Sequence, residues 1–97
     1  MEKSKRTIQQ TTHFKRDLKR ESKGPNKGIL SQEFVKIVWT LANDIPLNAK
    51  YSDHSLGGNW KDHRDCHIRP DLVLIYRKSG GELLQLVRLG SHSELGL

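Results

Sequence analysis

Residues 71–76 read Asp71-Leu72-Val73-Leu74-Ile75-Tyr76, a nearly unbroken apolar run. Such a run is typical of a central strand that is covered on both faces. The hairpin turn Ser79-Gly80-Gly81-Glu82 follows it and leads into a second apolar stretch at 83–89. On the other side, residues 60–68 alternate between apolar and polar side chains. The pattern predicts three adjacent antiparallel strands in the second half of the chain.

The first half predicts a short edge strand at 6–10 and two helices. Thr11 or Thr12 is a suitable N-cap for the first helix, which runs to residue 21 and stops at the Gly-Pro-Asn segment 24–26. Ser31 is the expected cap of the second helix, with Leu30 placed to contact Val35 as a hydrophobic staple. Apolar residues of the second helix recur at helical spacing: Phe34, Val35, Ile37, Val38, Leu41 and Ala42. We therefore expect an α+β fold, an antiparallel sheet (short N-terminal strand plus three C-terminal strands) with two helices packed on one face.

Length and composition restrict the class of protein. A chain of 97 residues is expected to form one domain over 1–97, and its mean hydropathy is −0.70. No segment approaches the ~20 apolar residues of a membrane span, and the polar start has no apolar region of a signal peptide. Cys66 is the single cysteine, which excludes an internal disulfide and fits a reducing compartment. We expect a soluble cytoplasmic protein.

Positive charge is concentrated at the start of the chain. Residues 1–36 contain ten Lys and Arg against four acidic residues, which accounts for the whole formal net charge of +6. Such asymmetry favours a nucleic acid or an acidic protein as partner, although a solvated helix face is the simpler alternative. The basic residues of the first predicted helix and its end are Lys15, Arg16, Lys19, Arg20 and Lys23.

The candidate reactive groups all lie in the second half. They are three histidines and two carboxylates, namely His54, Asp65, His67, Asp71 and His92. Strand alternation places His63, Asp65 and His67 on one face, and Cys66 with Ile68 on the other. Together these groups suit transesterification at a phosphodiester: a histidine or carboxylate takes a proton from the ribose 2′-hydroxyl, and a protonated histidine gives one to the leaving 5′-oxygen. The sequence thus favours a small enzyme acting on RNA.

Arg88 interrupts an apolar strand. It is expected either to clamp a phosphate or to form an ion pair with Asp65 or Asp71.

His63, Cys66 and His67 are close in sequence, a pattern that superficially suggests a zinc site. A strand turns Cys66 away from both histidines, and no CxxC or HExxH motif accompanies them. We therefore expect catalysis without a metal or other cofactor, and no nucleophilic role for Cys66.

Three segments carry a family resemblance: YSDHSLGGNWKDHRDCH (51–67), PDLVLIY (70–76) and VRLGSH (87–92). They are similar to the DH-x-L-x-G-x-W/L-K-x-x-R-D/E-x-H-x-x-P-D stretch and the closing R-x-G-(S/T)-H of the YafQ-like branch of the RelE/ParE toxin superfamily. The match is specific over residues 46–92 and looser over the two helices. Two positions depart from the pattern: Gly96 stands where the family usually has an aromatic residue, and His63 also occupies a usually aromatic position.

The resemblance implies a RelE-like fold and a type II toxin, a ribosome-dependent endoribonuclease that cuts messenger RNA in the decoding site. Its implied partners are the 70S ribosome, messenger RNA and a cognate antitoxin that is acidic and DNA-binding and forms a heteromeric complex with it. The basic residues of the first helix then become a surface for RNA, ribosome or antitoxin. By motif position, His54, His67, Asp71 and His92 match the catalytic residues, and Asp65 and Arg88 the supporting ones. We expect His54 as base, His92 as acid, and His67 with Asp71 orienting or stabilising charge.

Two alternatives remain at this point. One is a non-catalytic relative that, like the ParE branch, poisons a protein target through its surface. The other is a basic RNA-binding module with incidental histidines. The histidine set argues against the first, because the ParE branch generally lacks such a cluster. The second leaves the grouping of Asp65, His67, Asp71 and His92 unexplained.

Overall fold

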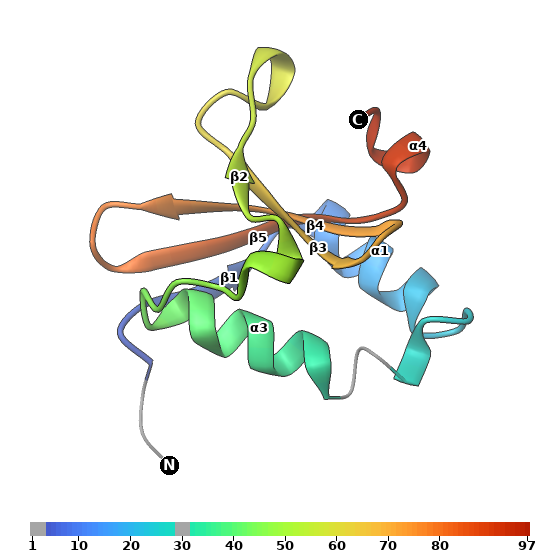
Figure 1. The fold of residues 1–97 in the computed structure, drawn as a ribbon, viewed down its shortest axis with the longest axis horizontal. Coiled ribbons are helices and arrows are strands. Elements are labelled where there is room, and N and C mark those ends of the chain that lie inside the picture. The colour runs from blue at the N-terminus through green and yellow to red at the C-terminus, as the bar shows by residue number, and fades with distance from the viewer. Residues whose placement is uncertain (1–3, 29–31) are drawn as a thin grey trace.

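A mixed β-sheet forms the centre of the structure (Figure 1). The computed structural model describes residues 4–28 and 32–97, and five strands are found within these ranges. They are β1 (Thr7–Gln10), β2 (His54–Ser55), β3 (Arg64–Arg69), β4 (Leu72–Ser79) and β5 (Leu83–Gly90), in the order β1-β5-β4-β3-β2. β4 is the middle strand, and its residues from Leu72 to Tyr76 are all buried, as the apolar run predicts.

Two features of the sheet differ from the expectation. β3, β4 and β5 are antiparallel as predicted, but β1 lies parallel to β5, with Ile8 opposite Leu84. No hairpin joins these two strands, so no tight turn fixes their relative direction. The strand predicted at 60–68 begins only at Arg64, because the 3-10 turn η2 (Gly58–Trp60) and the turn after it occupy residues 60–62. Earlier in the same loop lie a second 3-10 turn, η1 (Ala49–Tyr51), and the two-residue β2.

The described residues include the helices α1 (Thr12–Glu21), α3 (Glu33–Ala42) and the short α4 (His92–Leu95), of which α4 was not predicted. Thr11 is the N-cap of α1, since its side chain accepts a hydrogen bond from Phe14 N–H. The expected cap and staple residues of the second helix, Ser31 and Leu30, lie outside the described residues. Val35 is 57% exposed, so its assignment to the apolar face of that helix was wrong. The other five predicted apolar residues of α3 are buried.

The two faces of the sheet have different neighbours. α1 and α3 cover one face, and β2, the loop after it and α4 rise on the opposite side (Figure 1). The main core lies under the two long helices and includes Phe14, Leu41 and Leu74. A smaller cluster on the other face joins Val73 and Ile75 to Leu95 of α4. One face is thus committed to packing, and the other is free to display polar side chains.

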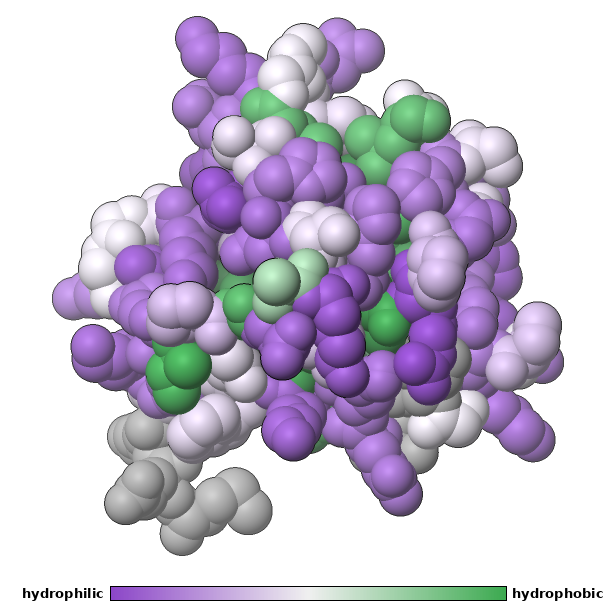
Figure 2. Space-filling model, viewed as in Figure 1, coloured by the Kyte–Doolittle hydropathy of each residue, from purple (hydrophilic) through white to green (hydrophobic). Residues whose placement is uncertain are grey.

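The surface is mostly hydrophilic in the view of Figure 2, where hydrophobic residues show only as small separate patches. No described helix is long and apolar enough to cross a membrane.

Candidate active site

Strand register brings the predicted reactive residues together on the face opposite the long helices. His54 of β2 lies directly across from Asp65 of β3, and His67 follows two residues later on the same side of the strand. His92 begins α4, just after β5 ends. The ring centroids are 6.0 Å apart for His54 and His67, and 5.0 Å apart for His67 and His92. The prediction that these three histidines converge is confirmed.

His54 is held through one of its ring nitrogens. Its Nδ1 lies 2.7 Å from the carbonyl oxygen of Ser52 and 3.1 Å from Oδ1 of Asp65. Both neighbours are acceptors, so Nδ1 carries the hydrogen and Nε2 keeps its lone pair in the neutral ring. A nitrogen in that state can accept a proton from a substrate.

Asp65 is a buried carboxylate with an incomplete set of partners. It is 2% exposed, and its Oδ1 has no hydrogen-bond donor among the described residues, because the His54 ring N–H points to Ser52. Burial raises the pKa of Asp65, while the charge of nearby histidines opposes that rise. A buried oxygen left unpaired beside two imidazoles is a feature of functional sites rather than of packing.

His92 is held by Asp71. The carboxylate lies 2.9 Å from the main-chain N–H of His92 and 2.7 Å from its Nδ1. These two hydrogen bonds lower the pKa of Asp71, so the group is ionised and Nδ1 is the donor. The sequence analysis grouped Asp71 with His67, whereas in the structure its partner is His92.

His67 lies between the other two rings and is half-buried. Its Nε2 is 4.0 Å from Oδ1 of Asp65, which is the outer limit of an ion pair. His63 is not part of this group, because it packs edge-on against Trp60 at 5.5 Å. The cluster therefore consists of three imidazoles and two carboxylates.

Two residues that support the site were not predicted. Ser52 has a φ of +49°, a left-handed backbone that turns its carbonyl toward His54. Asp53 accepts hydrogen bonds from Tyr76 Oη at 2.6 Å and Arg64 Nε at 3.1 Å, which fixes the loop before β2. The position of Asp53 beside His54 in the DH motif was the available signal.

Arg88 takes a different partner from the two that were expected. Its Nε lies 2.6 Å from Oδ2 of Asp17 in α1, not beside Asp65 or Asp71. Asp17 is far from Arg88 in sequence, so no local pattern indicated the pair. Burial alone would raise the pKa of Asp17, but hydrogen bonds and charge from Arg88, Leu89 and Arg20 lower it.

The predicted basic surface is present but smaller than expected. Arg20 is engaged with Asp17, Glu21 and Glu94. The remaining members are exposed: Lys15, Arg16, Lys19 and Lys23.

Cys66 is fully buried in the main core, and burial raises the pKa of its thiol. The prediction that it faces away from the histidines is confirmed. Within 4–28 and 32–97, no group of three or more His, Cys, Asp and Glu side chains is arranged to hold a metal ion.

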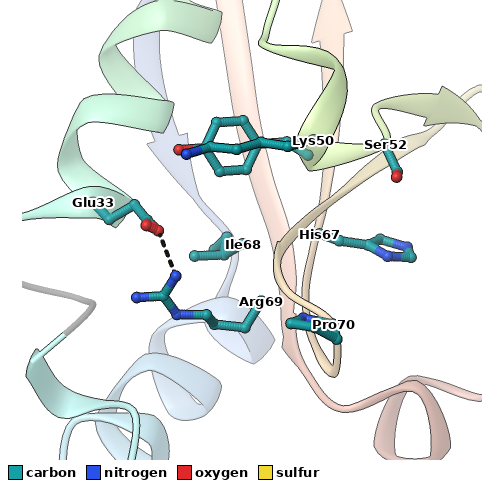
Figure 3. A pocket seen from close by; sticks show the side chains of 8 residues that line it. Glu33, Lys50, Ser52, His67, Ile68, Arg69 and Pro70 are labelled. Carbon is teal, nitrogen blue, oxygen red and sulfur yellow. Dashed lines mark ion pairs between the residues drawn. The ribbon is translucent and has the colours of Figure 1, made fainter.

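A groove of about 420 Å³ adjoins the histidine cluster. Figure 3 shows His67 and Ser52 on one side of β3, and the ion pair between Arg69 and Glu33 (3.1 Å) on the other. The ammonium of Lys50 lies 5.1 Å from the ring centroid of Tyr51. The lining residues are Glu33, Lys50, Tyr51, Ser52, His67, Ile68, Arg69 and Pro70. The groove's cations thus lie across β3 from the His67 ring.

A protein with this fold and site is a toxin of a type II toxin–antitoxin system. The sequence matches the family described as "Bacterial toxin of type II toxin-antitoxin system, YafQ" over residues 6–96. The chain belongs to the YafQ family. It is 37% identical over 95 residues to the mRNA interferase toxin YafQ of Escherichia coli K12, covering 93% of this chain and 95% of that protein.

Solved structures agree with this assignment. The E. coli DinJ–YafQ toxin–antitoxin complex contains a chain with a TM-score of 0.80 and 34% identity, covering 94% of this chain and 97% of that chain. A metal-bound toxin from Helicobacter pylori has a TM-score of 0.75 and 44% identity, covering 92% and 97% respectively. The predicted RelE-like α+β fold class is confirmed by the structure and these neighbours.

Proposed function

We propose that this protein is an endoribonuclease that cuts messenger RNA on the ribosome, in the decoding site, by metal-independent acid–base catalysis. The observation that carries the proposal is that two imidazole rings, those of His54 and His92, are each held through the Nδ1 atom. Nδ1 of His54 contacts Ser52 O and Nδ1 of His92 contacts Asp71, which leaves both Nε2 atoms for substrate. The relative named as an mRNA interferase supports the choice of substrate.

The reaction proposed is transesterification at one phosphodiester. Nε2 of His54 takes the proton from the ribose 2′-hydroxyl, and the 2′-oxygen forms a bond to phosphorus. The bond from phosphorus to the 5′-oxygen breaks, and protonated His92 gives that oxygen a proton through Nε2. The products are a 2′,3′-cyclic phosphate and a 5′-hydroxyl, so atoms and charge balance without water. Each proton transfer is expected to contribute roughly 10²–10⁴ in rate.

The remaining charged groups have roles in the same step. Asp65 lies 3.1 Å from Nδ1 of His54, so its negative charge favours the imidazolium formed when that ring takes a proton. Asp71 does the same for His92. His67 lies between the two rings, where a positive charge stabilises the phosphorane-like transition state. Lys50 and Arg69 line the adjoining groove across β3 from the His67 ring, and Arg69 is already paired with Glu33, so neither is assigned a part in this step.

The proposed partners follow from the charge distribution and the family. We expect an acidic, DNA-binding antitoxin that neutralises the toxin in a heteromeric complex in the cytoplasm, as DinJ is in complex with YafQ in E. coli. The exposed Lys15, Arg16, Lys19 and Lys23 offer a basic surface for the antitoxin or the ribosome. One domain over residues 1–97 carries both this surface and the site.

Cleavage mapping tests the proposal against its alternatives. Primer extension on messenger RNA from cells expressing the chain is expected to reveal discrete cuts within reading frames, and none with His54→Ala or His92→Ala. If both variants cut as the parent chain does, the histidine mechanism is wrong. Growth arrest without any cut would instead favour a ParE-like toxin that acts on a protein, and RNA binding without arrest would favour a simple RNA-binding module.

A further inference from the structure

Along one edge of β5, the first residues pair with the strand β1, and the last residues are bonded by α1 and its N-cap. β1 pairs with β5 only as far as Gln10, opposite Leu86. Beyond that point, side chains of α1 and its N-cap bond the β5 main chain. Thr11 Oγ1 donates to Val87 O at 2.8 Å, and Leu89 N–H donates to Asp17 at 3.0 Å. The segment that leads into α4, and so to His92, is therefore fixed by α1.

Arg20 is the residue of α1 that reaches furthest along this segment. Its Nη1 lies 3.0 Å from Asp17 and its Nη2 2.8 Å from the carbonyl oxygen of Leu89. Its Nε lies 3.3 Å from Oε2 of Glu94, and 3.1 Å from Oε2 of Glu21. One guanidinium thus joins α1, the end of β5 and α4, which the fork of donors in arginine permits and an ammonium does not.

Gly90 makes room for this contact. A Cβ atom at position 90 would lie 2.9 Å from Nη2 of Arg20 and 3.1 Å from Oε1 of Glu94. Both distances are shorter than ordinary van der Waals contact, so a side chain here would push the guanidinium away. The glycine of the RLGSH segment is therefore needed for the close approach of Arg20 and Glu94.

Glu94 connects the bridge to the start of α4. Its Oε1 accepts a hydrogen bond from Ser91 N–H at 2.9 Å, and Ser91 Oγ accepts one from Glu94 N–H at 3.2 Å, which is a capping box. The Ser91 N–H, with Arg20, lowers the pKa of Glu94, so the carboxylate is charged at neutral pH. A helix of four residues has too few internal hydrogen bonds to persist alone, and it depends on such anchors.

We propose that Arg20 and Glu94 are positioning residues for His92. This inference rests on the proposed function, in which His92 is the acid. The ion pair holds α4 against the end of β5 at the place where His92 meets Asp71 and His67. Neither residue needs to touch the substrate, so loss of the pair lowers kcat and leaves KM near its normal value. A displacement of about 1 Å at a catalytic group costs up to roughly a hundredfold in rate.

Glu94→Gln is the decisive variant, because glutamine keeps the capping box but removes the charge that pairs with Arg20. It is compared with Arg20→Gln, with the double variant, and with Glu82→Gln as a control on the exposed β4–β5 turn. We would measure kcat and KM for cleavage of a defined messenger RNA on ribosomes, and Tm for each chain. Both single variants are expected to lose roughly ten- to a hundredfold in kcat. The kcat of the double variant is expected to be no lower than that of the less active single variant, because both substitutions remove the same ion pair.

A normal kcat in Glu94→Gln, or a change in KM alone in Arg20→Gln, would overturn the inference. Arg20 would then be assigned to the basic surface that binds a partner. If Arg20→Gln fails to fold, Glu94→Gln decides alone. His92→Ala distinguishes failure of the positioning role of Arg20 and Glu94 from failure of the proposed function. Lost cleavage in His92→Ala with normal kcat in the pair variants rejects only the inference. Normal cleavage in His92→Ala rejects the role of His92 as the acid, which is the part of the proposed function on which the inference rests.

Discussion

Asp71 holds His92 at two points, through the main-chain N–H at 2.9 Å and the ring Nδ1 at 2.7 Å. The double contact fixes both the start of α4 and the orientation of the ring. Since the pKa of Asp71 is lowered by these bonds, the carboxylate stays charged at neutral pH beside the ring of His92, the proposed acid. An acid held in this way can present Nε2–H to a leaving oxygen in one orientation.

Replacing Asp71 with asparagine is expected to lower kcat roughly tenfold or more, since the imidazolium of His92 loses its counter-charge. Asp71 is exposed, so Tm should change little. Asp62→Asn is a matched control, because Asp62 is an exposed residue with a φ of +70° that asparagine tolerates. Equal activity of the two variants would show that Asp71 does not orient the acid.

Removal of either proposed proton-transfer partner should be severe. His54→Ala and His92→Ala are each expected to lower the single-turnover cleavage rate by roughly 10²–10⁴ while the far-ultraviolet dichroism stays that of the parent chain. His13→Ala, an exposed histidine on α1, is the control and should cleave normally. A loss confined to one of the two variants would restrict acid–base chemistry to a single histidine.

Asp65 is expected to cost stability in exchange for function. Because burial raises its pKa in the folded chain, ionising it destabilises the fold. This cost grows as pH rises from the usual carboxyl pKa of about 4 to the raised pKa, and is constant above it. Asp65→Asn should therefore have a Tm a few degrees higher than the parent chain at pH 7, with the difference vanishing near pH 4, and should cleave more slowly. A lower Tm at pH 7 would mean that Asp65 is a structural anchor instead.

Ionisation of Asp17 has the opposite effect on stability to that of Asp65. Its pKa is lowered in the folded chain, so it stabilises the fold above the usual carboxyl pKa near 4, and this contribution is lost as pH falls below it. Asp17→Asn leaves Arg88 without its anion and removes one of the three carboxylates around Arg20. Its free energy of unfolding, measured in urea at pH 7, is expected to be lower by about 3–5 kcal/mol. The gap between variant and parent should narrow at pH 3. A gap that is independent of pH would indicate lost packing rather than a lost charge.

The basic surface of α1 should act in binding. Changing Lys15, Arg16 and Lys19 to glutamate is expected to weaken binding of an acidic antitoxin segment and of ribosomes, and to flatten the dependence of ribosome binding on salt. Because all three side chains are exposed, Tm should be little affected. Unchanged affinity for both partners would remove this surface from the account.

The elements with a strong local signal were predictable. The apolar run of β4, the turn before β5 and the apolar stripe of α3 all appear where the pattern places them. α4 was not predicted because four residues carry no periodicity, although Ser91-x-x-Glu94 with Gly96 behind it is a capping box followed by a left-handed C-cap, here at φ +69°. That signal was present in the sequence.

Pairings between distant residues could not be predicted from local patterns. Asp71 was expected to act with His67, but the residue that it contacts is His92, 21 positions away. Arg88 contacts Asp17 across 71 positions, and which of several acidic residues it meets depends on how α1 crosses the end of β5. The parallel direction of β1 could not be predicted for the same reason. It depends on how the helices that separate β1 from β5 in the sequence pack on the sheet.

End-group analysis of the cleaved messenger RNA tests the central claim most directly. If His54 activates a ribose 2′-hydroxyl and His92 protonates the leaving oxygen, the downstream fragment carries a 5′-hydroxyl, and a single 2′-deoxy substitution at the mapped site abolishes the cut. A downstream fragment that carries a 5′-phosphate, or a cut that survives the 2′-deoxy substitution, would contradict the mechanism.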